Sequence, residues 1–376
     1  MNKTTSLAGA IIHAGARALG GLAAERLWEQ MPDAEAASSQ PFESWKRLLI
    51  AQLEDLAGTL AVDRPRLFVA QVQEQQAVVA ARGVPPEIFR AALQALRDVL
   101  VEKLSPLLAE TVSPYFDQAL AEVSTPQDRH ESEWNRGSPL ARMAAEYLLA
   151  VLEGDRHRAW HVVRTAASEG TPLEDLYLHL LAPAQAEIGR MWMQDEANIA
   201  EEHFVSSTTK WVVTRLQQLA VRQPPHGKTL LAAGVAGNQM DVGLHMLGDL
   251  FEIDGWQVVQ LGADVPADDL AQAVELYQVD VVGLSVAMNN QFTALQAAVQ
   301  AIRTSTGAQR VKILVGGRAL EHASDLKEEL DVDAIVHSLA DARELARQLT
   351  GLPTRNVRET PLVGEKKQKE GGPRST

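Results

Sequence analysis

The chain contains no cysteine. This absence excludes disulfides, thiolate metal sites, iron–sulfur clusters and a thioether-linked bilin. Long hydrophobic runs are also missing: no stretch reaches the roughly 18 uninterrupted apolar residues that a membrane-spanning helix requires. The Ala- and Gly-rich first 25 residues are interrupted by His13, Arg17, Glu25 and Arg26, which is not the pattern of a signal peptide. We therefore expect a cytoplasmic protein that does not contact a membrane.

Positive charge is scarce, and the formal net charge is −14. Direct nucleic-acid binding requires cations that neutralise phosphates, so this charge argues against it. The clear basic cluster is Lys366, Lys367 and Lys369, in a tail over 351–376 whose composition predicts disorder.

The first part of the chain is predicted to be helical. Residues 1–42 are expected to form an amphipathic helix or a tail. Apolar residues recur at helical spacing over 43–123, for example at Trp45, Leu49 and Leu53, which predicts a helical domain with a break at 83–86. This domain is expected to serve as an input, relay or homodimerisation unit. The polar segment 124–138 is expected to be a linker.

A second helical block covers 139–222. Breaks at 153–155, 169–172 and 195–198 divide it into four helices of bundle length. Residues 223–227 contain two prolines and a glycine and form the next hinge.

From 228 to 350 the pattern becomes one of alternating strands and helices. Short β-branched or apolar runs lie at 229–233, 257–261, 279–285, 312–315 and 334–336. Helical patterns separate them, at 242–254, 266–278, 290–306 and 319–330. Such alternation predicts a doubly wound, flavodoxin- or Rossmann-like parallel sheet. The expected fold class is thus α/β plus all-α.

Ligands of open parallel sheets bind beyond the carboxyl ends of the strands. The loops expected there are 234–241, 262–264, 285–289 and 316–318, and several are rich in small residues. Glycine allows a large ligand to approach the backbone, although tight turns also need glycine.

The spacing of these motifs over 139–348 resembles the cobalamin-binding family, which has a four-helix cap before a Rossmann-like domain. Gly243 is followed by Gly255-Trp256 and by Leu261-Gly262-Ala263-Asp264, and then by Gly283-Leu284-Ser285 and Gly316-Gly317. In that family the serine and glycine loops line the slot for the nucleotide tail of the cofactor.

The cap adds a second resemblance. Trp192 is followed by nine residues and then by Glu202-His203, which is similar to the signature of cobalamin photoreceptors. The resemblance implies that Trp192 packs on an adenosyl group and that Glu202 and His203 make polar contacts. The full set of cofactor-binding residues implied by the resemblance is Trp192, Glu202, His203, Asn238, Gln239, Met240, Asp241, Gly243, Leu261, Gly262, Ser285, Val286, Gly316 and Gly317.

The chain departs from the family at the cobalt ligand. The family's Asp-x-His-x-x-Gly motif places a histidine below the metal, whereas here Asn238 and Met240 stand at the aspartate and histidine positions. His245 also precedes a glycine by three residues, but that register would place it inside the first helix. A histidine that follows the cap tryptophan in photoreceptors is Met193 here. His203 remains the candidate metal ligand. Cobalamin could sit base-on, sit base-off with an unligated lower face, or not bind.

These features favour a cobalamin-binding sensor or regulator that signals to a protein partner, with light acting through adenosylcobalamin as one form that the signal could take. Two alternatives stay open. One is a degenerate module that binds another flat ligand or only protein. The other is a corrinoid carrier of methyl groups, although carriers normally depend on the missing lower histidine. No nucleophile elbow, P-loop, His-Glu metal motif, catalytic carboxylate pair or recognisable DNA-binding domain is present, so we expect no enzyme activity of its own.

Overall fold

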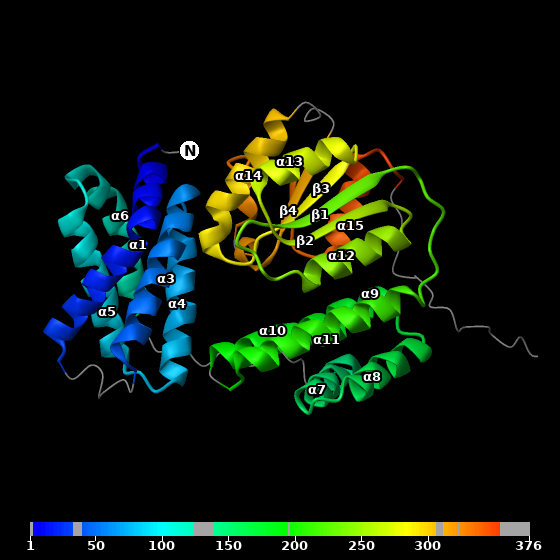
Figure 1. Cartoon of the computed structure of the whole chain (residues 1–376), viewed down its shortest axis with the longest axis horizontal. Coiled ribbons are helices and arrows are strands. Elements are labelled where there is room, and N and C mark those ends of the chain that lie inside the picture. Colours follow the sequence, from blue (N-terminus) through cyan, green and yellow to red (C-terminus); the bar gives the residue numbers. More distant parts are fainter. Residues whose placement is uncertain are drawn as a thin grey trace, which may run out of the picture.

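The computed structural model describes residues 3–32, 40–123, 138–194, 196–305, 311–321 and 323–353. They form an N-terminal helical bundle, a four-helix cap and an α/β domain that contacts both (Figure 1). The predicted linker and tail lie almost wholly outside the described residues, as does the side chain of Met193.

The described residues of the N-terminal bundle form five helices around one core. They are α1 (Lys3–Gln30), α3 (Phe42–Ala61), α4 (Pro65–Ala81), α5 (Pro86–Lys103) and α6 (Pro106–Glu122). Three of them begin at a proline, whose fixed φ and missing N–H suit the first helical position. Trp45, Phe68, Phe89 and Phe116 are fully or almost fully buried in the core.

Helix α1 belongs to this core, whereas the sequence suggested a separate helix or tail over 1–42. Small residues explain the difference, because they let α1 lie close against α3. A Cβ atom at Gly20 would lie 2.6 Å from Ile50 Cγ1, and one at Gly9 would lie 2.8 Å from the Ala57 carbonyl oxygen. By length and composition α1 could cross a membrane. This differs from the expectation above, which counted only uninterrupted apolar residues. One face of α1 is buried in the bundle, and core helices share this composition.

The cap has the four helices that its breaks predict. They are α7 (Pro139–Leu152), α8 (Arg156–Ser168), a third helix made of α9 (Leu173–Leu176), the π-helical turn η1 (Tyr177–Leu181) and α10 (Ala182–Met193), and finally α11 (Ile199–Gln217). The cap core continues into Met246, Leu250 and Ile253 of α12 (Val242–Ile253) in the α/β domain.

The α/β domain is a five-stranded parallel sheet, which confirms the predicted fold class. Its strands are β1 (Thr229–Val235), β2 (Gln257–Val265), β3 (Val281–Ser285), β4 (Lys312–Gly316) and β5 (Ala334–Val336), in the order β2-β1-β3-β4-β5. Helices α12 and α15 (Leu339–Leu349) cover one face, and α13 (Ala267–Leu276) and α14 (Phe292–Thr304) cover the other (Figure 1).

Two details of the sequence prediction are wrong. The segment 319–330 is not a helix but contains two 3-10 turns, η3 (Arg318–Leu320) and η4 (Ser324–Leu326). Its buried residues Leu320, Ala323 and Leu326 recur every three residues, as a 3-10 repeat requires. The predicted loop 262–264 is a bulged extension of β2, made possible by positive φ angles at Gly262 and Asp264.

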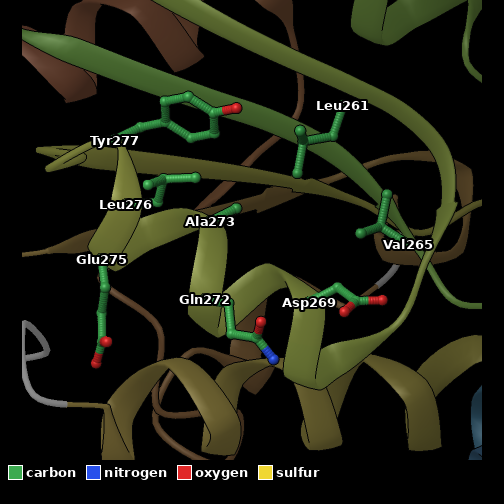
Figure 2. Close-up of a pocket in the computed structure, with 8 residues that line it drawn as sticks. All are labelled: Leu261, Val265, Asp269, Gln272, Ala273, Glu275, Leu276 and Tyr277. Atoms are coloured by element: carbon green, nitrogen blue, oxygen red, sulfur yellow. The ribbon is translucent and has the colours of Figure 1, made fainter.

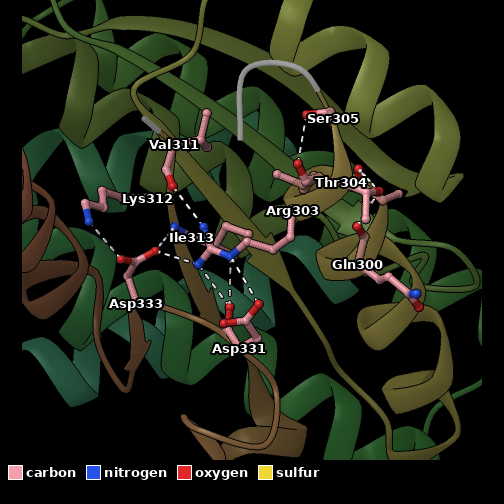
Figure 3. Close-up of polar contacts among 11 residues, drawn as sticks. Gln300, Arg303, Thr304, Ser305, Val311, Lys312, Ile313, Asp331 and Asp333 are labelled. Atoms are coloured by element: carbon pink, nitrogen blue, oxygen red, sulfur yellow. Dashed lines mark hydrogen bonds and ion pairs between the residues drawn. The ribbon is translucent and has the colours of Figure 1, made fainter. Parts of the chain in front are cut away.

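Ion pairs and hydrogen bonds stabilise the end of the sheet where the strands begin. Arg303, in the last turn of α14, donates to the carbonyl oxygens of Asp331 and Val311 and to the Asp333 carboxylate (Figure 3). Lys312 Nζ lies 3.1 Å from the same Asp333 side chain. These charged contacts occupy the amino ends of the strands. The carboxyl ends, where ligands of open parallel sheets bind, remain for a ligand.

The N-terminal bundle docks on the loops beyond β3 and β4. Helix α3 packs against the turn η2 (Asn289–Gln291), and Asn289 Nδ2 donates to the Leu67 carbonyl oxygen over 3.2 Å. A Cβ atom at Gly58 would lie 1.9 Å from the Asn289 carbonyl oxygen. Only glycine therefore permits this approach of helix to loop.

We predict that Gly58→Ala destabilises the protein by about 1–3 kcal/mol, because the added methyl overlaps the Asn289 backbone. Gly21→Ala is the matched control. Its Cβ would meet no atom closer than Lys46 Cε at 3.9 Å, so alanine there is expected to be neutral or stabilising. Thermal unfolding of both variants checks the contrast, and equal Tm changes would contradict the close docking.

We also predict that stability falls as pH rises from about 4 to about 7 through Asp55. Burial raises the pKa of Asp55 from 3.8 to about 7, with Glu54 and Glu74 adding to the effect of burial. In that window the folded protein retains a proton that the unfolded chain releases. The loss of stability from ionising the buried carboxyl group is therefore complete above the raised pKa. Asp55→Asn should reduce the loss of Tm between about pH 5 and about pH 8. An unchanged loss would show that Asp55 is not buried in this interface.

Candidate functional site

A cavity of about 440 Å³ lies between α12, the sheet and the cap. We call it the slot. Four of the cofactor-binding residues predicted from the sequence contribute to its wall: Gly243, Ser285, Gly316 and Gly317. Further lining residues from the sheet and α12 are Leu230, Leu244, Leu247, Phe251, Leu314 and Val336. The slot is thus a largely apolar space at the end of the sheet where the predicted loops lie.

Glycines hold the slot open. Gly317 has a φ of 114°, and a Cβ there would lie 2.3 Å from the Val286 carbonyl oxygen. A Cβ at Gly316 would lie 2.9 Å from Val336 Cγ2, and one at Gly283 would lie 3.3 Å from Leu247 Cδ2. Larger residues would therefore either clash with the backbone or fill the slot.

Asn238 is fully buried and fastens the loop after β1 to β3. Its Nδ2 donates to the Ser285 carbonyl oxygen at 2.9 Å and to Ser285 Oγ at 3.2 Å. Its Oδ1 accepts from the Met240 N–H at 3.0 Å. The residue at the family's aspartate position thus serves the loop itself.

The same loop is fastened to β2 by Asp264. The Asp264 carboxylate accepts from the Gly237 N–H at 2.6 Å and from Gln239 Nε2 at 3.0 Å. Leu261 and Gly262 lie on β2 beside this contact, and Leu261 also faces the groove described below. These bonds fix the loop before any ligand binds.

Met240 projects from this rigid loop with 63% of its surface exposed. No imidazole stands in its place. His245 lies one turn into α12, where its Nε2 is 3.3 Å from Asp241 Oδ2. That contact fits the expectation of a residue on the helix surface. No group of three or more potential metal ligands occurs in the part of the chain that the structure describes.

The cap residues Trp192, Glu202 and His203 lie where α10 ends and α11 begins. Asn198 and Glu201 form a capping box that fixes the start of α11. Ser206 Oγ donates to Glu202 Oε1 over 2.7 Å, and His203 Nε2 lies 3.7 Å from Glu202 Oε2. Glu202 is held in place, whereas the His203 side chain is 73% exposed.

The cap end and the loop after β1 are joined by one ion pair. Lys210 Nζ of α11 lies 3.0 Å from Asp241 Oδ1. His203 precedes Lys210 by two helical turns, so it lies on the same face about 10 Å farther along the helix. Exposed apolar side chains belong to both sides of this region: Trp192, Phe204, Met240 and Met288.

A second contact ties the cap to α12. The Tyr177 hydroxyl donates to Asp249 Oδ2 over 2.9 Å, and burial raises the pKa of Asp249 to about 7. The wall of the slot on this side comes from Leu178 and Ala182. Leu178, Ala182 and His337 were not predicted from the sequence, since no local pattern marks them, whereas Arg318 lies in the predicted loop 316–318.

A larger and more open groove of about 800 Å³ runs along the outer edge of β2 against α13 (Figure 2). It is lined by Leu261, Val265, Asp269, Gln272, Ala273, Glu275, Leu276 and Tyr277. The groove belongs to the face covered by α13 and α14, whereas the slot belongs to the face of α12. The two hollows are therefore separate.

Two known domain families match this chain. A B12 binding domain matches residues 228–346, and a second B12 binding domain matches residues 143–217. These segments coincide with the α/β domain and the cap, and residues 1–123 fall outside both.

Relatives show the same coverage. A corrinoid protein of Desulfitobacterium hafniense is 21% identical over 206 residues, which are 54% of this chain and 94% of that protein. The HTH-type transcriptional repressor CarH of Myxococcus xanthus is 27% identical over 198 residues, which are 52% of this chain and 64% of the repressor. A solved monomethylamine corrinoid protein of Methanosarcina barkeri aligns at 14% identity with a TM-score of 0.45, over 56% of this chain and 98% of that one.

We predict that Asn238→Asp lowers stability by about 1–3 kcal/mol, because a carboxylate cannot donate to the Ser285 carbonyl oxygen. Asn198→Asp is the control, since the Asn198 side chain caps α11 as an acceptor and aspartate caps equally well. Chemical denaturation measures both changes. Equal stability of the two variants would show that the buried amide does not hold the loop.

Proposed function

Because the chain belongs to the cobalamin-binding family and binds a corrinoid, we propose that it is a sensor that signals to a protein partner and uses adenosylcobalamin. The proposal makes the protein a cytoplasmic, homodimeric regulator with no catalytic activity and no direct contact with nucleic acid or membrane.

The residues of the slot fit the nucleotide tail of such a cofactor. The tail ends in a flat heteroaromatic base, and the slot is apolar, bounded by glycines and closed on one side by the cap. A bound corrinoid supplies a cobalt–carbon bond that light or ligand exchange can break. The chain would supply the tail site in the slot, the loop that carries Met240 and the cap residues Trp192, Glu202 and His203.

One observation favours a sensor over a methyl carrier: Met240 stands on the loop where the family has its cobalt-binding histidine. Carriers normally depend on that imidazole. A thioether is a poorer ligand for oxidised cobalt than an imidazole is. This loop is therefore poorly suited to a cobalt ion that changes its oxidation state repeatedly. A regulator needs only to hold the cofactor and respond to its upper ligand.

The upper ligand would be read by the cap. Trp192 provides an exposed aromatic surface for an adenosyl group, and Glu202 is held by Ser206 at a fixed position beside His203. His203 would be the imidazole that the cap offers to the metal in place of the adenosyl group. Loss of that group would change how the cap meets the α/β domain through Lys210 and Asp241.

A carrier is the second candidate, since the chain covers 94% of the corrinoid protein of Desulfitobacterium hafniense. In that case methylcobalamin rather than adenosylcobalamin would be retained, and illumination would have no specific effect. A degenerate module that has lost corrinoid binding would retain neither methylcobalamin nor adenosylcobalamin.

The prediction is that purified protein mixed with adenosylcobalamin retains it through desalting, and that green light changes its absorbance spectrum. His203→Ala should still bind in the dark but give a different spectrum after illumination, because one ligand is removed. His161→Ala, an exposed histidine of α8 on the same cap, is the matched control and should behave as wild type.

Three outcomes would contradict parts of this proposal. Retention of methylcobalamin alone favours the carrier, and loss of all colour favours the degenerate module. A His203→Ala variant that binds and responds to light as wild type removes that residue from the upper face.

A further inference from the structure

We propose that Arg318 binds the phosphodiester of the corrinoid tail at the slot, and that Glu74 of the N-terminal bundle competes for the same guanidinium. Tail binding and docking of the bundle would then oppose each other. This inference rests on the proposed function only in requiring that a corrinoid tail enters the slot.

The charge of the slot supports Arg318 as the phosphate partner. Among the described residues that line the slot, Arg318 is the sole arginine or lysine, and Glu321 is the sole carboxylate. A phosphodiester placed at an apolar cavity needs a cation or several hydrogen bonds to replace lost water. Guanidinium is suited to this role because its donors match two phosphate oxygens at once.

Arg318 already has a partner from the N-terminal bundle. Its Nη2 lies 3.2 Å from Glu74 Oε2 of α4, and the two side chains are 50% and 39% exposed. A pair with this exposure is weak, so a phosphate in the slot could displace the carboxylate. Gly317, directly before Arg318, is packed against the Val286 backbone, which fixes the origin of the side chain beside the slot.

Displacement of Glu74 would weaken docking because acidic groups crowd the interface. Asp55 is buried under the Asn289–Asn290 turn, its Oδ1 has no hydrogen-bond partner, and Glu54 and Glu74 lie near enough to act on it. Arg318 is the cation that offsets them. When the phosphate draws Arg318 away, Glu74 loses its ion-pair partner across the interface.

Arg64 offers a contrast. It also joins the bundle to the α/β domain, through Asp325 at 3.1 Å and Glu329 at 2.7 Å, but it does not line the slot. Loss of Arg64 therefore weakens docking without removing the cation from the slot. By linkage, weaker docking should favour tail binding.

The test titrates the full chain with cobalamin and with cobinamide, a corrinoid that lacks the nucleotide tail. Arg318→Gln should weaken cobalamin binding about tenfold and leave cobinamide unchanged, since one charge-assisted contact is lost. Glu74→Gln and Arg64→Gln should tighten cobalamin binding up to about fivefold, again without effect on cobinamide. Hydrogen exchange over 55–67 should increase when cobalamin is added but not when cobinamide is added.

The opposite signs for Arg318→Gln and Arg64→Gln make the test decisive. Tighter cobalamin binding by both variants would mean that Arg318 acts only through docking, and equal loss of both corrinoids would mean a general defect in folding. Either result overturns the assignment of Arg318 but leaves corrinoid binding intact. If Arg318→Gln is unstable, Arg318→Lys should retain most of the preference for cobalamin. Wild-type protein that binds neither corrinoid overturns the proposed function as well.

Discussion

In the proposed mode of binding, burial of a flat aromatic tail in the slot is the interaction on which the rest depends, because the loop after β1 offers no imidazole to the metal. An aromatic group of this size removes enough apolar area from water to contribute about 5 kcal/mol. The strand order β2-β1-β3-β4-β5 places β1, β3 and β4 side by side, and each contributes residues to the wall of the slot. Glycines at 283, 316 and 317 keep the space free.

Three parts of the molecule meet around this slot. The cap reaches the loop after β1 through Lys210 and α12 through Tyr177, while the N-terminal bundle reaches the loops after β3 and β4 through Asn289 and Arg318. Both interfaces contain a buried carboxyl group, Asp249 or Asp55, whose pKa is raised to about 7 by burial. Burial of a carboxyl group destabilises each interface, so a modest signal is sufficient to shift either one between two arrangements.

Strand and helix periodicity predicted the fold class and the four cap helices, because each pattern is local. Motif spacing likewise identified Gly243, Ser285, Gly316 and Gly317 at the slot. The packing of α1 into the bundle was not predictable, since close contact through Gly9 and Gly20 depends on α3, which is distant in sequence. Loop 316–318 was predicted as a ligand loop, but the role of Arg318 was not, because its partner Glu74 lies 244 residues earlier in the sequence.

The state of the cofactor base tests burial of the tail most directly. Cob(II)alamin bound to uniformly nitrogen-15-labelled protein can be examined by electron paramagnetic resonance. Only the cofactor's own nitrogen-14 base can then split the cobalt lines into triplets, whereas a histidine such as His203 would give doublets. Burial of the tail in the slot predicts no triplet. A triplet would show the base on cobalt and the slot without its tail, which would contradict the mode of binding described above.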